Sequence, residues 1–497
     1  MTKKNSQKLV GRHAEKKRLH ELVLSKRAEF IALYGRRRIG KTFLVEQYLG
    51  GLSQTFIHIT GQIDADRTRQ LEIFQTEIEK KLFDQRRLPP FLTWNVAFQQ
   101  LISGLKRRIS ESPKGIITVF LDEIPWLSTQ KSGLLSALDH AWNTELRHIS
   151  NLKLVVCGSA AAWMIKNIVN AKGGLHNRLT ASMRLAPFNL QETEEYLHAR
   201  GIKLSRREII TLYMAFGGVA YYLDFVRRGQ SATQAIGTTC FGSGELSSEF
   251  DRLFTSLFGD SGDHLKIIRI LARRREGLTR DFIVNAMNTS SGGLLSLRLH
   301  ELIEAGFIDL IVPLGRKIKD AQYRIIDEFV LFALSWIEKA PRGAMIPRDI
   351  ENYWTAESST PSYRSWAGYA FENLCFKHQL EIRRALGIAG IATKVGSWRN
   401  HPKSKKEKGV QIDLVFARAD RCFTICEIKY YDVSFRIEKF YAEALGRKRA
   451  EFVKEFAKNK HVFTAMICAH GIDPNEYSRE LIDHIVTGDA FFMAKNV

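Results

Sequence analysis

The stretch from Gly35 to Thr42 carries the residue types and spacing of a polyphosphate-binding loop. It reads G-x-x-x-x-G-K-T and lies between an apolar run at 30–34 and a helical pattern at 43–48. A glycine-bearing turn between a strand and a helix N-terminus directs backbone N–H groups and the positive end of the helix dipole at one point. We therefore expect ATP here, with Lys41 at the β- and γ-phosphates and the Thr42 hydroxyl on Mg²⁺. The predicted nucleotide-binding residues are Val10, Gly11, Gly35, Arg36, Arg37, Arg38, Ile39, Gly40, Lys41, Thr42, Phe43 and Ser159.

An acidic pair, Asp122 and Glu123, follows a second apolar run. Residues 116–121 read Ile-Ile-Thr-Val-Phe-Leu, which is typical of a strand buried on both faces of a parallel sheet. We expect Asp122 to hold Mg²⁺ and Glu123 to act as general base for the attacking water. Such a pair is also ordinary turn chemistry. Its position, about eighty residues after the loop and at the end of a buried strand, favours the catalytic interpretation.

Ser159 and Arg178 are candidates for contact with the terminal phosphate. Ser159 follows the apolar run 152–157, and ligands of doubly wound sheets lie at the carboxyl ends of the strands. A helix N-cap is the alternative role for this serine. Arg178 precedes the run 181–185 and is a candidate arginine finger, either in its own chain or in a neighbouring subunit. A plain surface arginine is the alternative, and as a finger Arg178 would be the one internal sign of a homo-oligomer.

A second constellation lies near the other end of the chain. Glu427 and Lys429 alternate on an apolar strand pattern, so they share one face, and Asp413 comes from the preceding strand of a predicted hairpin. Two carboxylates that bridge Mg²⁺ beside a lysine form an apparatus for hydrolysing a phosphodiester. Glu372, on a predicted amphipathic helix, would complete the metal ligands. An edge strand with alternating charges facing solvent is the alternative.

The elements that would position these residues predict an α/β fold. Strand-like runs alternate with helical patterns through residues 1–188, which indicates a P-loop NTPase with a parallel sheet. Residues 189–260 lose strand character and are predicted to form a helical lid. A linker at 336–362 is expected to precede a last α/β domain at 363–497, which contains a basic loop at 399–408.

Residues 261–335 have the pattern of a winged helix-turn-helix. Three amphipathic helices, the third after the N-cap candidates Ser290 and Ser291, precede two strands joined by a basic turn. In such a fold the third helix enters the major groove and the wing touches the DNA backbone. A contact with another protein is the alternative. The predicted DNA contacts are Arg298 on the third helix and Arg316, Lys317 and Lys319 on the wing.

The overall composition favours a polyanionic partner. The chain has 497 residues, a net charge of +21 and a pI near 9.7, so nucleic acid, and DNA first, is the expected partner, with an anionic membrane surface second. Six scattered cysteines without a C-x-x-C pair are typical of a reducing cytoplasm. No apolar run approaches the ~18 residues that cross a bilayer. The N-terminus lacks the pattern of a secretory signal, and we expect a cytoplasmic protein.

The motifs resemble a known family. Val10-Gly11-Arg12, the loop 35–42, Leu121-Asp122-Glu123, Cys157-Gly158-Ser159 and the stretch 217–223 are similar to those of the archaeal-type AAA+ ATPases of prokaryotes, which stand near the signalling (STAND) ATPases. The resemblance implies a winged helix and a C-terminal domain similar to PD-(D/E)XK nucleases. The residues that match the nuclease-like pattern are Tyr369-Ala370-Phe371-Glu372, Ile412-Asp413 and Glu427-Ile428-Lys429.

Together these patterns predict an ATP-hydrolysing AAA+ protein that acts on DNA. A metal-dependent C-terminal nuclease would cleave phosphodiesters under the control of ATP. The alternative is a nucleotide-operated switch or DNA-binding regulator whose last domain holds DNA or a partner without cutting it. A membrane-linked signalling ATPase is a third and less supported hypothesis.

Overall fold

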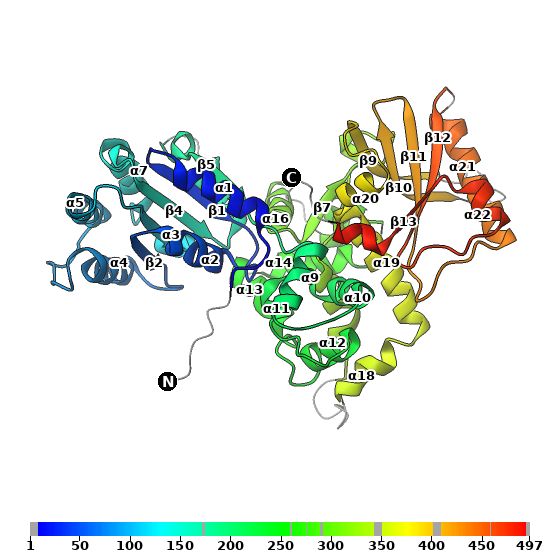
Figure 1. Cartoon of the computed structure of the whole chain (residues 1–497), viewed down its shortest axis with the longest axis horizontal. Helices are drawn as coiled ribbons and strands as arrows, with labels where there is room; N and C mark the ends of the chain where they lie inside the picture. Colours follow the sequence, from blue (N-terminus) through cyan, green and yellow to red (C-terminus); the bar gives the residue numbers. More distant parts are fainter. Residues whose placement is uncertain are drawn as a thin grey trace. The chain divides into compact units, whose positions relative to one another are not determined.

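The computed structural model describes residues 8–170, 174–258, 261–274, 276–288, 292–341, 350–400, 409–457 and 459–493. Ser290, Ser291 and most of the predicted basic loop lie outside these ranges. The chain forms two compact units, Met1–Pro187 and Phe188–Val497. Figure 1 traces both units in the colours of the sequence.

Five parallel strands form the sheet of the N-terminal unit. They are β1 (Glu29–Tyr34), β2 (Thr55–Thr60), β3 (Ile117–Asp122), β4 (Leu152–Gly158) and β5 (Ala181–Arg184), in the order β2-β3-β4-β1-β5. β3 and β4 are buried along their whole length, as expected for central strands covered on both faces. The predicted α/β fold with a parallel sheet is confirmed for this unit, and it is consistent with a P-loop NTPase fold.

Helices cover both faces of this sheet because alternate residues of each strand point to opposite sides. Phe30 and Ala32 of β1 pack with α4 (Arg67–Leu82), α5 (Trp94–Glu111) and α7 (Leu134–Thr144). Ile31 and Leu33 pack with α1 (His13–Leu24) and with the helical segment that begins as α2 (Lys41–Leu44) and continues through α3 (Gly50–Leu52). Figure 1 shows α1 lying along the sheet. The polyphosphate-binding sequence is therefore the connection between β1 and a helix of the second layer.

The C-terminal unit begins with a group of helices over the predicted lid segment. They are α9 (Leu190–Ala199), α10 (Arg206–Phe216), α11 (Ala220–Leu223), α12 (Ala232–Cys240) and α13 (Glu249–Phe258). Capping boxes start α9 and α10, where Asn189 and Ser205 exchange hydrogen bonds with a glutamate three residues later. The turn after α10 requires glycine at Gly218, because φ is 68° and a Cβ there would lie 2.1 Å from the Phe188 carbonyl oxygen.

Three helices and a small antiparallel sheet follow. The helices are α14 (Gly262–Leu271), α15 (Arg280–Met287) and α16 (Gly292–Glu304). The strands are β6 (Leu278–Thr279), β7 (Ile308–Ile311) and β8 (Gln322–Ile325), in the order β6-β8-β7. A turn at 312–321 joins β7 to β8 and forms a hairpin whose tip carries the predicted basic residues.

The last part of the unit is a five-stranded mixed sheet. Its strands are β9 (Thr393–Asn400), β10 (Val410–Arg418), β11 (Cys422–Lys429), β12 (His461–Cys468) and β13 (His484–Thr487), in the order β13-β12-β11-β10-β9. β9, β10 and β11 are antiparallel neighbours, whereas β11, β12 and β13 are parallel. The long helix α19 (Pro361–Lys377) precedes the sheet, and the long helix α21 (Lys439–Phe456) connects β11 to β12. The shorter helices are α20 (Gln379–Ala385) and α22 (Glu476–Leu481).

The predicted linker at 336–362 is largely packed rather than extended. Within its described part, α18 (Ile350–Glu357) places Trp354 at 1% exposure, stacked on Phe241 with ring centroids 5.7 Å apart. Trp336 and Trp366 meet the same indole edge-on. Large aromatic side chains gain most from burial, so a segment rich in them joins a core instead of spanning solvent. The prolines and serines of residues 336–362 are typical of an extended linker, which is why the sequence predicts one here.

Residues near both ends of the C-terminal unit share one core. Phe491, in the last described turn, lies 5.7 Å from the ring of His378 and 6.1 Å from that of Phe371. A Cβ on Gly488 would lie 2.8 Å from Ile210 of α10. Residues 188–497 therefore form one compact unit, and the division of this unit into a lid, a winged helix, a linker and a last domain stays a prediction.

His378 makes the stability of this unit sensitive to acid. The ring is buried and Nδ1 lies 2.9 Å from the Leu374 carbonyl oxygen, and burial lowers the pKa of His378 from its ordinary value near 6.5 to about 4. As the pH falls, His378 of the unfolded chain binds a proton near pH 6.5, whereas His378 of the folded chain does so only near pH 4. The free energy of unfolding is therefore highest above pH 6.5 and decreases as the pH falls toward 4. We expect a loss of about 2 kcal/mol at pH 5 relative to His378→Asn, which does not titrate. Urea unfolding of both proteins at pH 7.5 and pH 5 measures this difference, and identical pH dependences would contradict it.

Two global features bear on the class of protein. Over the described residues, each helix is too short or too polar to cross a bilayer. The six cysteines are free thiols, and five of them are buried. Burial raises the pKa of Cys157, Cys240 and Cys375, so these thiols stay protonated at neutral pH.

Candidate functional site

The loop after β1 has the backbone of a phosphate cradle. Gly35 has a φ of 147°, and a Cβ there would lie 2.3 Å from the Leu185 carbonyl oxygen, so the position excludes every other residue. Gly40 has a φ of 87° and immediately precedes α2. The loop therefore ends at a helix N-terminus, where backbone N–H groups and the helix dipole favour an anion.

Lys41 bends back over this loop. Its ammonium donates hydrogen bonds to the carbonyl oxygens of Gly35, at 3.0 Å, and Arg36, at 2.9 Å, and its side chain is 6% exposed. Both hydrogen-bond acceptors of this buried ammonium are neutral carbonyl oxygens. Phosphate oxygens entering the cradle would supply an anionic partner.

Thr42 and Asp122 are brought together by neighbouring segments of the fold. The Thr42 hydroxyl donates to Asp122 Oδ2 at 2.7 Å. His58, at the end of β2, lies 3.6 Å from the same oxygen, 3.1 Å from Glu46, and stacks on Phe120. Burial would raise the pKa of Asp122, but hydrogen bonds from His58 and Thr42 outweigh it and keep the carboxylate ionised. An ionised carboxylate beside a hydroxyl is a donor set suited to Mg²⁺.

Glu123 is held at the same edge of the sheet by Ser159. Glu123 Oε2 accepts hydrogen bonds from the Ser159 amide at 3.0 Å and the Ser159 hydroxyl at 2.9 Å. Burial raises the pKa of the Glu123 carboxyl, which moves it toward the range of a general base at neutral pH. Glu123 also has a φ of 48°, a left-handed conformation that is uncommon for residues with side chains and clusters at functional sites.

Arg12 holds the phosphate-binding loop in place through hydrogen bonds to backbone carbonyls. Its guanidinium is 3% exposed and donates to the Ala186 carbonyl at 2.5 Å and the Ile39 carbonyl at 2.7 Å. The predicted turn at Val10 and Gly11 therefore lies beside the phosphate-binding loop, because Arg12 joins it to Ile39. A planar guanidinium can span two acceptors that a lysine cannot reach together.

Removing the Arg12 side chain should weaken both the fold and the loop. For Arg12→Ala we expect a lower melting temperature and about tenfold weaker nucleotide binding, because charge-assisted hydrogen bonds contribute about 1.5–3 kcal/mol. Thermal unfolding and equilibrium binding of a fluorescent ATP analogue measure the two effects. Arg18→Ala, which removes an exposed arginine of the same helix, should change neither. Unchanged binding in Arg12→Ala would show that the loop keeps its shape without the Arg12 side chain.

Arg178 lies toward the amino ends of the strands, whereas the groups described above lie at the carboxyl ends. It ends the short helix Gly174–Arg178 before β5, and the neighbouring Thr180 bonds to the backbone of Phe30 at the start of β1. Its Nε lies 3.8 Å from Asp139 Oδ1. The phosphate-binding loop follows the end of β1, so the structure does not bring Arg178 to the loop of its own chain. Action on a neighbouring subunit stays a prediction.

Comparison with known proteins identifies this part of the chain. Residues 9–226 match the family model of an ATPase domain found predominantly in Archaea. This segment is therefore similar to archaeal-type ATPase domains. It spans the N-terminal unit and continues through α11, so the predicted lid segment begins inside the matched region.

Relatives and solved structures of low identity are similar to longer parts of the chain. An uncharacterized protein of Methanocaldococcus jannaschii is 23% identical over 456 residues, which cover 90% of this chain and 94% of that protein. The Walker-type ATPase of Pyrococcus abyssi is 18% identical, with a TM-score of 0.45, and covers 66% of this chain and 96% of its own. The ORC2 protein of Aeropyrum pernix, in ADPNP and ADP complexes, is 13% identical, with a TM-score of 0.42 and coverages of 71% and 96%.

The C-terminal unit brings together three of the residues predicted for phosphodiester chemistry. The β10–β11 register pairs Leu414 with Cys426, which places Asp413 opposite Glu427 on one face of the hairpin. Asp413 Oδ2 accepts a hydrogen bond from the Ile428 amide at 3.1 Å. Lys429 Nζ lies 3.2 Å from Glu427 Oε1. The edge-strand alternative does not fit, because Glu427 is only 5% exposed and β11 lies inside the sheet.

Three side chains hold Glu427 in place. Lys448 donates to both carboxylate oxygens, at 2.9 and 2.7 Å, and the Tyr441 hydroxyl donates at 2.8 Å. Burial would raise the pKa of Glu427, but Lys429 and Lys448 outweigh it and keep the carboxylate ionised. Lys429 in turn stays charged beside Glu427, which raises its pKa against the effect of burial.

Asp413 is poised between its protonated and ionised forms. Burial, and then the nearby charges of Glu427 and Glu372, raise the pKa of Asp413 to about 7. A divalent cation relieves the electrostatic repulsion between neighbouring carboxylates, and carboxylate oxygens are ligands that Mg²⁺ prefers. The donor chemistry therefore fits Mg²⁺. Among the described residues, however, no group of three or more histidine, cysteine, aspartate or glutamate side chains is arranged to hold a metal ion, so Glu372, Asp413 and Glu427 are not a preformed cluster.

The residues predicted to contact DNA have different environments. Lys317 and Lys319 are exposed on the hairpin tip with Arg316. Arg298 of α16 instead donates to Glu301 at 3.0 Å, and Glu301 lies 2.8 Å from the buried His264. Arg298 is thus part of an internal ion-pair network.

Sequence reasoning named Arg12 only within the Val10-Gly11-Arg12 motif, without a role for its side chain. It missed three further side chains that organise these sites, which are His58, Tyr441 and Lys448. A histidine that interrupts an apolar strand at 56–59 is a signal that could have indicated His58. The others act across many residues of sequence, and their spacing gives no local pattern.

Proposed function

We propose that the ATPase domain binds ATP with Mg²⁺ at the β1–α2 loop and that its turnover controls phosphodiester hydrolysis in the C-terminal unit. The observation that carries the first part is the 2.7 Å hydrogen bond between Thr42 and Asp122. It joins the hydroxyl at the end of the phosphate cradle to the carboxylate at the end of β3. Thr42 and Asp122 would hold the Mg²⁺, which neutralises charge on the β- and γ-phosphates.

Residues of the chain supply the remaining steps of ATP hydrolysis. Lys41 exchanges its two carbonyl partners for phosphate oxygens and holds the β- and γ-phosphates. Glu123 accepts the proton of the attacking water, and Ser159 orients the Glu123 carboxylate. Arg178 would contribute to a second subunit's site in a homo-oligomer, since its own loop lies at the other edge of the sheet.

The C-terminal unit supports hydrolysis of a nucleic-acid backbone as the controlled reaction. Asp413 and Glu427 lie opposite each other on adjacent strands, and Lys429 is beside them. Asp413, with Glu372, would hold Mg²⁺, which polarises the scissile phosphate. Lys429 would orient the attacking water or neutralise the developing charge. The pattern α19, three antiparallel strands, α21 and a parallel strand is compatible with the nuclease-like fold that the sequence resembles.

DNA contact by the hairpin and the preceding helices remains part of this proposal. Three helices followed by a strand hairpin are compatible with a winged helix, and exposed Lys317 and Lys319 suit contact with a phosphate backbone. The free face of α16 carries Leu294 and Leu297, which are 48% and 46% exposed, and this composition favours a protein contact there.

A nucleotide-operated switch without cleavage is the second candidate. It is favoured by Glu427, whose two oxygens are already engaged by Lys448. The two functions are separated by incubating the protein with a labelled single-stranded oligodeoxynucleotide and with plasmid DNA, with Mg²⁺ and with or without ATP. Cleavage that needs Mg²⁺ and changes with ATP supports the controlled nuclease. ATP hydrolysis without cleavage of either substrate leaves the switch.

A further inference from the structure

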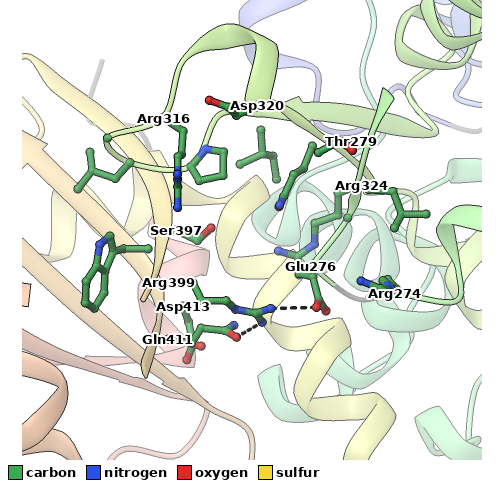
Figure 2. A pocket seen from close by; sticks show the side chains of 18 of the residues that line it. Arg274, Glu276, Thr279, Arg316, Asp320, Arg324, Ser397, Arg399, Gln411 and Asp413 are labelled. Carbon is green, nitrogen blue, oxygen red and sulfur yellow. Dashed lines mark hydrogen bonds and ion pairs between the residues drawn. The ribbon is translucent and has the colours of Figure 1, made fainter. Parts of the chain in front are cut away.

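A cavity in the C-terminal unit joins the hairpin to the predicted phosphodiester site. Its volume is about 600 Å³. The hairpin contributes Arg316 and Arg324, β9 contributes Arg399, and Asp413 and Glu372 also line the cavity. Figure 2 shows arginines from separate strands around the same space as Asp413. The cavity thus places cationic groups from one segment beside the carboxylates of another.

Arg324 is the unusual residue of this cavity. It is 7% exposed, and among the described residues its Nε and Nη2 have no hydrogen-bond partner. The guanidinium lies 4.9 Å from the ring of Tyr369 and 5.1 Å from that of Phe376, and Nη2 is 3.9 Å from Glu372. Buried guanidinium groups are normally hydrogen-bonded, because burying an N–H donor without a hydrogen-bond acceptor costs free energy. Two unpaired donors on a buried arginine that lines a cavity indicate a ligand with anionic oxygens.

The other arginines differ from Arg324 in how they are held. Arg399 pairs with Glu276 at 2.9 Å and also bonds to Gln411, as the dashed lines in Figure 2 show. Arg316 is exposed at the mouth, on the hairpin tip. Arg274, which also lines the cavity, is exposed and lies 5.1 Å from the ring of Phe282. Arg324 is thus the buried cation with unpaired donors, and Arg316 is the exposed cation of the hairpin tip.

We infer that this cavity binds the phosphodiester backbone of a single nucleic-acid strand, with Arg324 as the inner phosphate contact and Arg316 as the outer one. The inference rests on the proposed hydrolytic role of Asp413, which would lie next to the bound phosphate. A guanidinium presents a planar fork of donors that matches phosphate oxygens. Asp413 and Glu372, which line the same cavity, would share this phosphate through a divalent cation.

The size of the cavity selects a single strand. A B-form duplex has a major groove that alone is about 12 Å wide, so it cannot enter a space of about 600 Å³. One or a few unpaired nucleotides can. Cavities of this volume are typical of small-ligand sites.

The site needs both segments of the chain. The Leu314 amide donates to the Ser397 carbonyl at 3.0 Å, and a Cβ on Gly315 would lie 2.4 Å from the Phe456 ring. These close contacts hold the hairpin against β9 and α21, so the hairpin forms a wall of the cavity. The position of Arg324 then follows from β8, which continues the hairpin.

The test is binding of a fluorescein-labelled single-stranded oligodeoxynucleotide to the full chain, followed by fluorescence anisotropy. Lys429→Ala serves as the background to suppress cleavage, with Mg²⁺ present and ADP added to occupy the β1–α2 loop. We expect Arg324→Gln to weaken binding about 10- to 100-fold. The slope of log K against log salt should also fall by about 0.7, the value for one phosphate contact on a single strand. A merely structural role would not change that slope.

Two variants and a second substrate make the test specific. Arg418→Gln removes an equal charge from β10 outside the cavity, where Arg418 pairs with Asp420, and should leave affinity and slope unchanged. Arg316→Gln, at an exposed position, should reduce the slope without lowering the melting temperature. A blunt duplex of the same sequence should bind without dependence on Arg324.

The outcomes separate this inference from the proposed hydrolysis. Parent-like affinity and slope in Arg324→Gln would overturn the inference even if the parent protein cleaves DNA. Weakened binding in Arg324→Gln with no cleavage by the parent would keep the site and reject the hydrolysis. If Arg324→Gln has a lower melting temperature than the parent, the result for Arg316→Gln is decisive. An unchanged slope of log K against log salt in Arg316→Gln would then reject the site. Equal Arg324 dependence for the duplex would reject the assignment to a single strand.

Discussion

Replacing Glu123 with glutamine is expected to stop ATP turnover while ATP still binds. Glutamine retains an oxygen that can accept the hydrogen bonds of Ser159 but cannot take a proton from water. Loss of a general base costs about 10²- to 10⁴-fold in rate. Phosphate release measures turnover, and a fluorescent ATP analogue measures binding. The combination of slow turnover and near-normal binding is the result that assigns the base.

Two controls make this result interpretable. Lys41→Ala should lose binding itself, because it removes a buried ammonium whose hydrogen-bond acceptors are two carbonyl oxygens of the loop that phosphate oxygens would replace. Glu145→Gln removes a carboxylate that pairs with Lys106 at a distance from the loop and should leave turnover unchanged. Turnover of Glu123→Gln within a few-fold of the parent would assign the base to another group.

Replacing Lys429 with alanine should remove Mg²⁺-dependent DNA cleavage and leave ATP hydrolysis intact. This lysine is the cleaner target of the pair, because Glu427 keeps Lys448 and Tyr441 as partners when Lys429 is lost. Glu427→Ala would also abolish cleavage, but it leaves the Lys448 ammonium without its carboxylate and so threatens the fold. We expect a loss of at least about 10²-fold in cleavage rate for Lys429→Ala.

The matched control is Lys454→Ala on the exposed face of α21, which removes the same charge away from the carboxylates. Its cleavage rate should equal that of the parent. Cleavage that survives in both Lys429→Ala and Glu427→Ala would place the reaction elsewhere in the chain. ATP hydrolysis that disappears with cleavage in Lys429→Ala would instead point to a shared folding defect.

Local spacing explains what could be predicted in the N-terminal unit. The loop sequence, the apolar runs and the acidic pair each occupy a few consecutive residues, and a parallel sheet brings the ends of its strands to one edge. The Thr42–Asp122 contact and the Glu123–Ser159 contact are therefore consequences of strand order. The β10–β11 hairpin likewise places Asp413 opposite Glu427, because two adjacent antiparallel strands need only a short turn.

Long-range packing explains what could not be predicted. Arg12 reaches the Ala186 carbonyl across 174 residues, and no pattern near either residue indicates the pair. The sequence 336–362 contains prolines and serines typical of a linker, yet Trp354 joins the core through a partner more than a hundred residues away. No local pattern singles out Arg324, since the cavity it lines exists only when β8, β9 and α19 meet.

The meeting of Phe491 with Phe371 and His378 has a consequence for biosynthesis. The N-terminal unit closes with residues before 188, so it can fold while the ribosome is still translating. The second unit lacks the Phe491 ring until translation has passed residue 491. Termination before that residue would then yield a folded N-terminal unit attached to an incomplete second unit, a product that cellular proteolysis would remove.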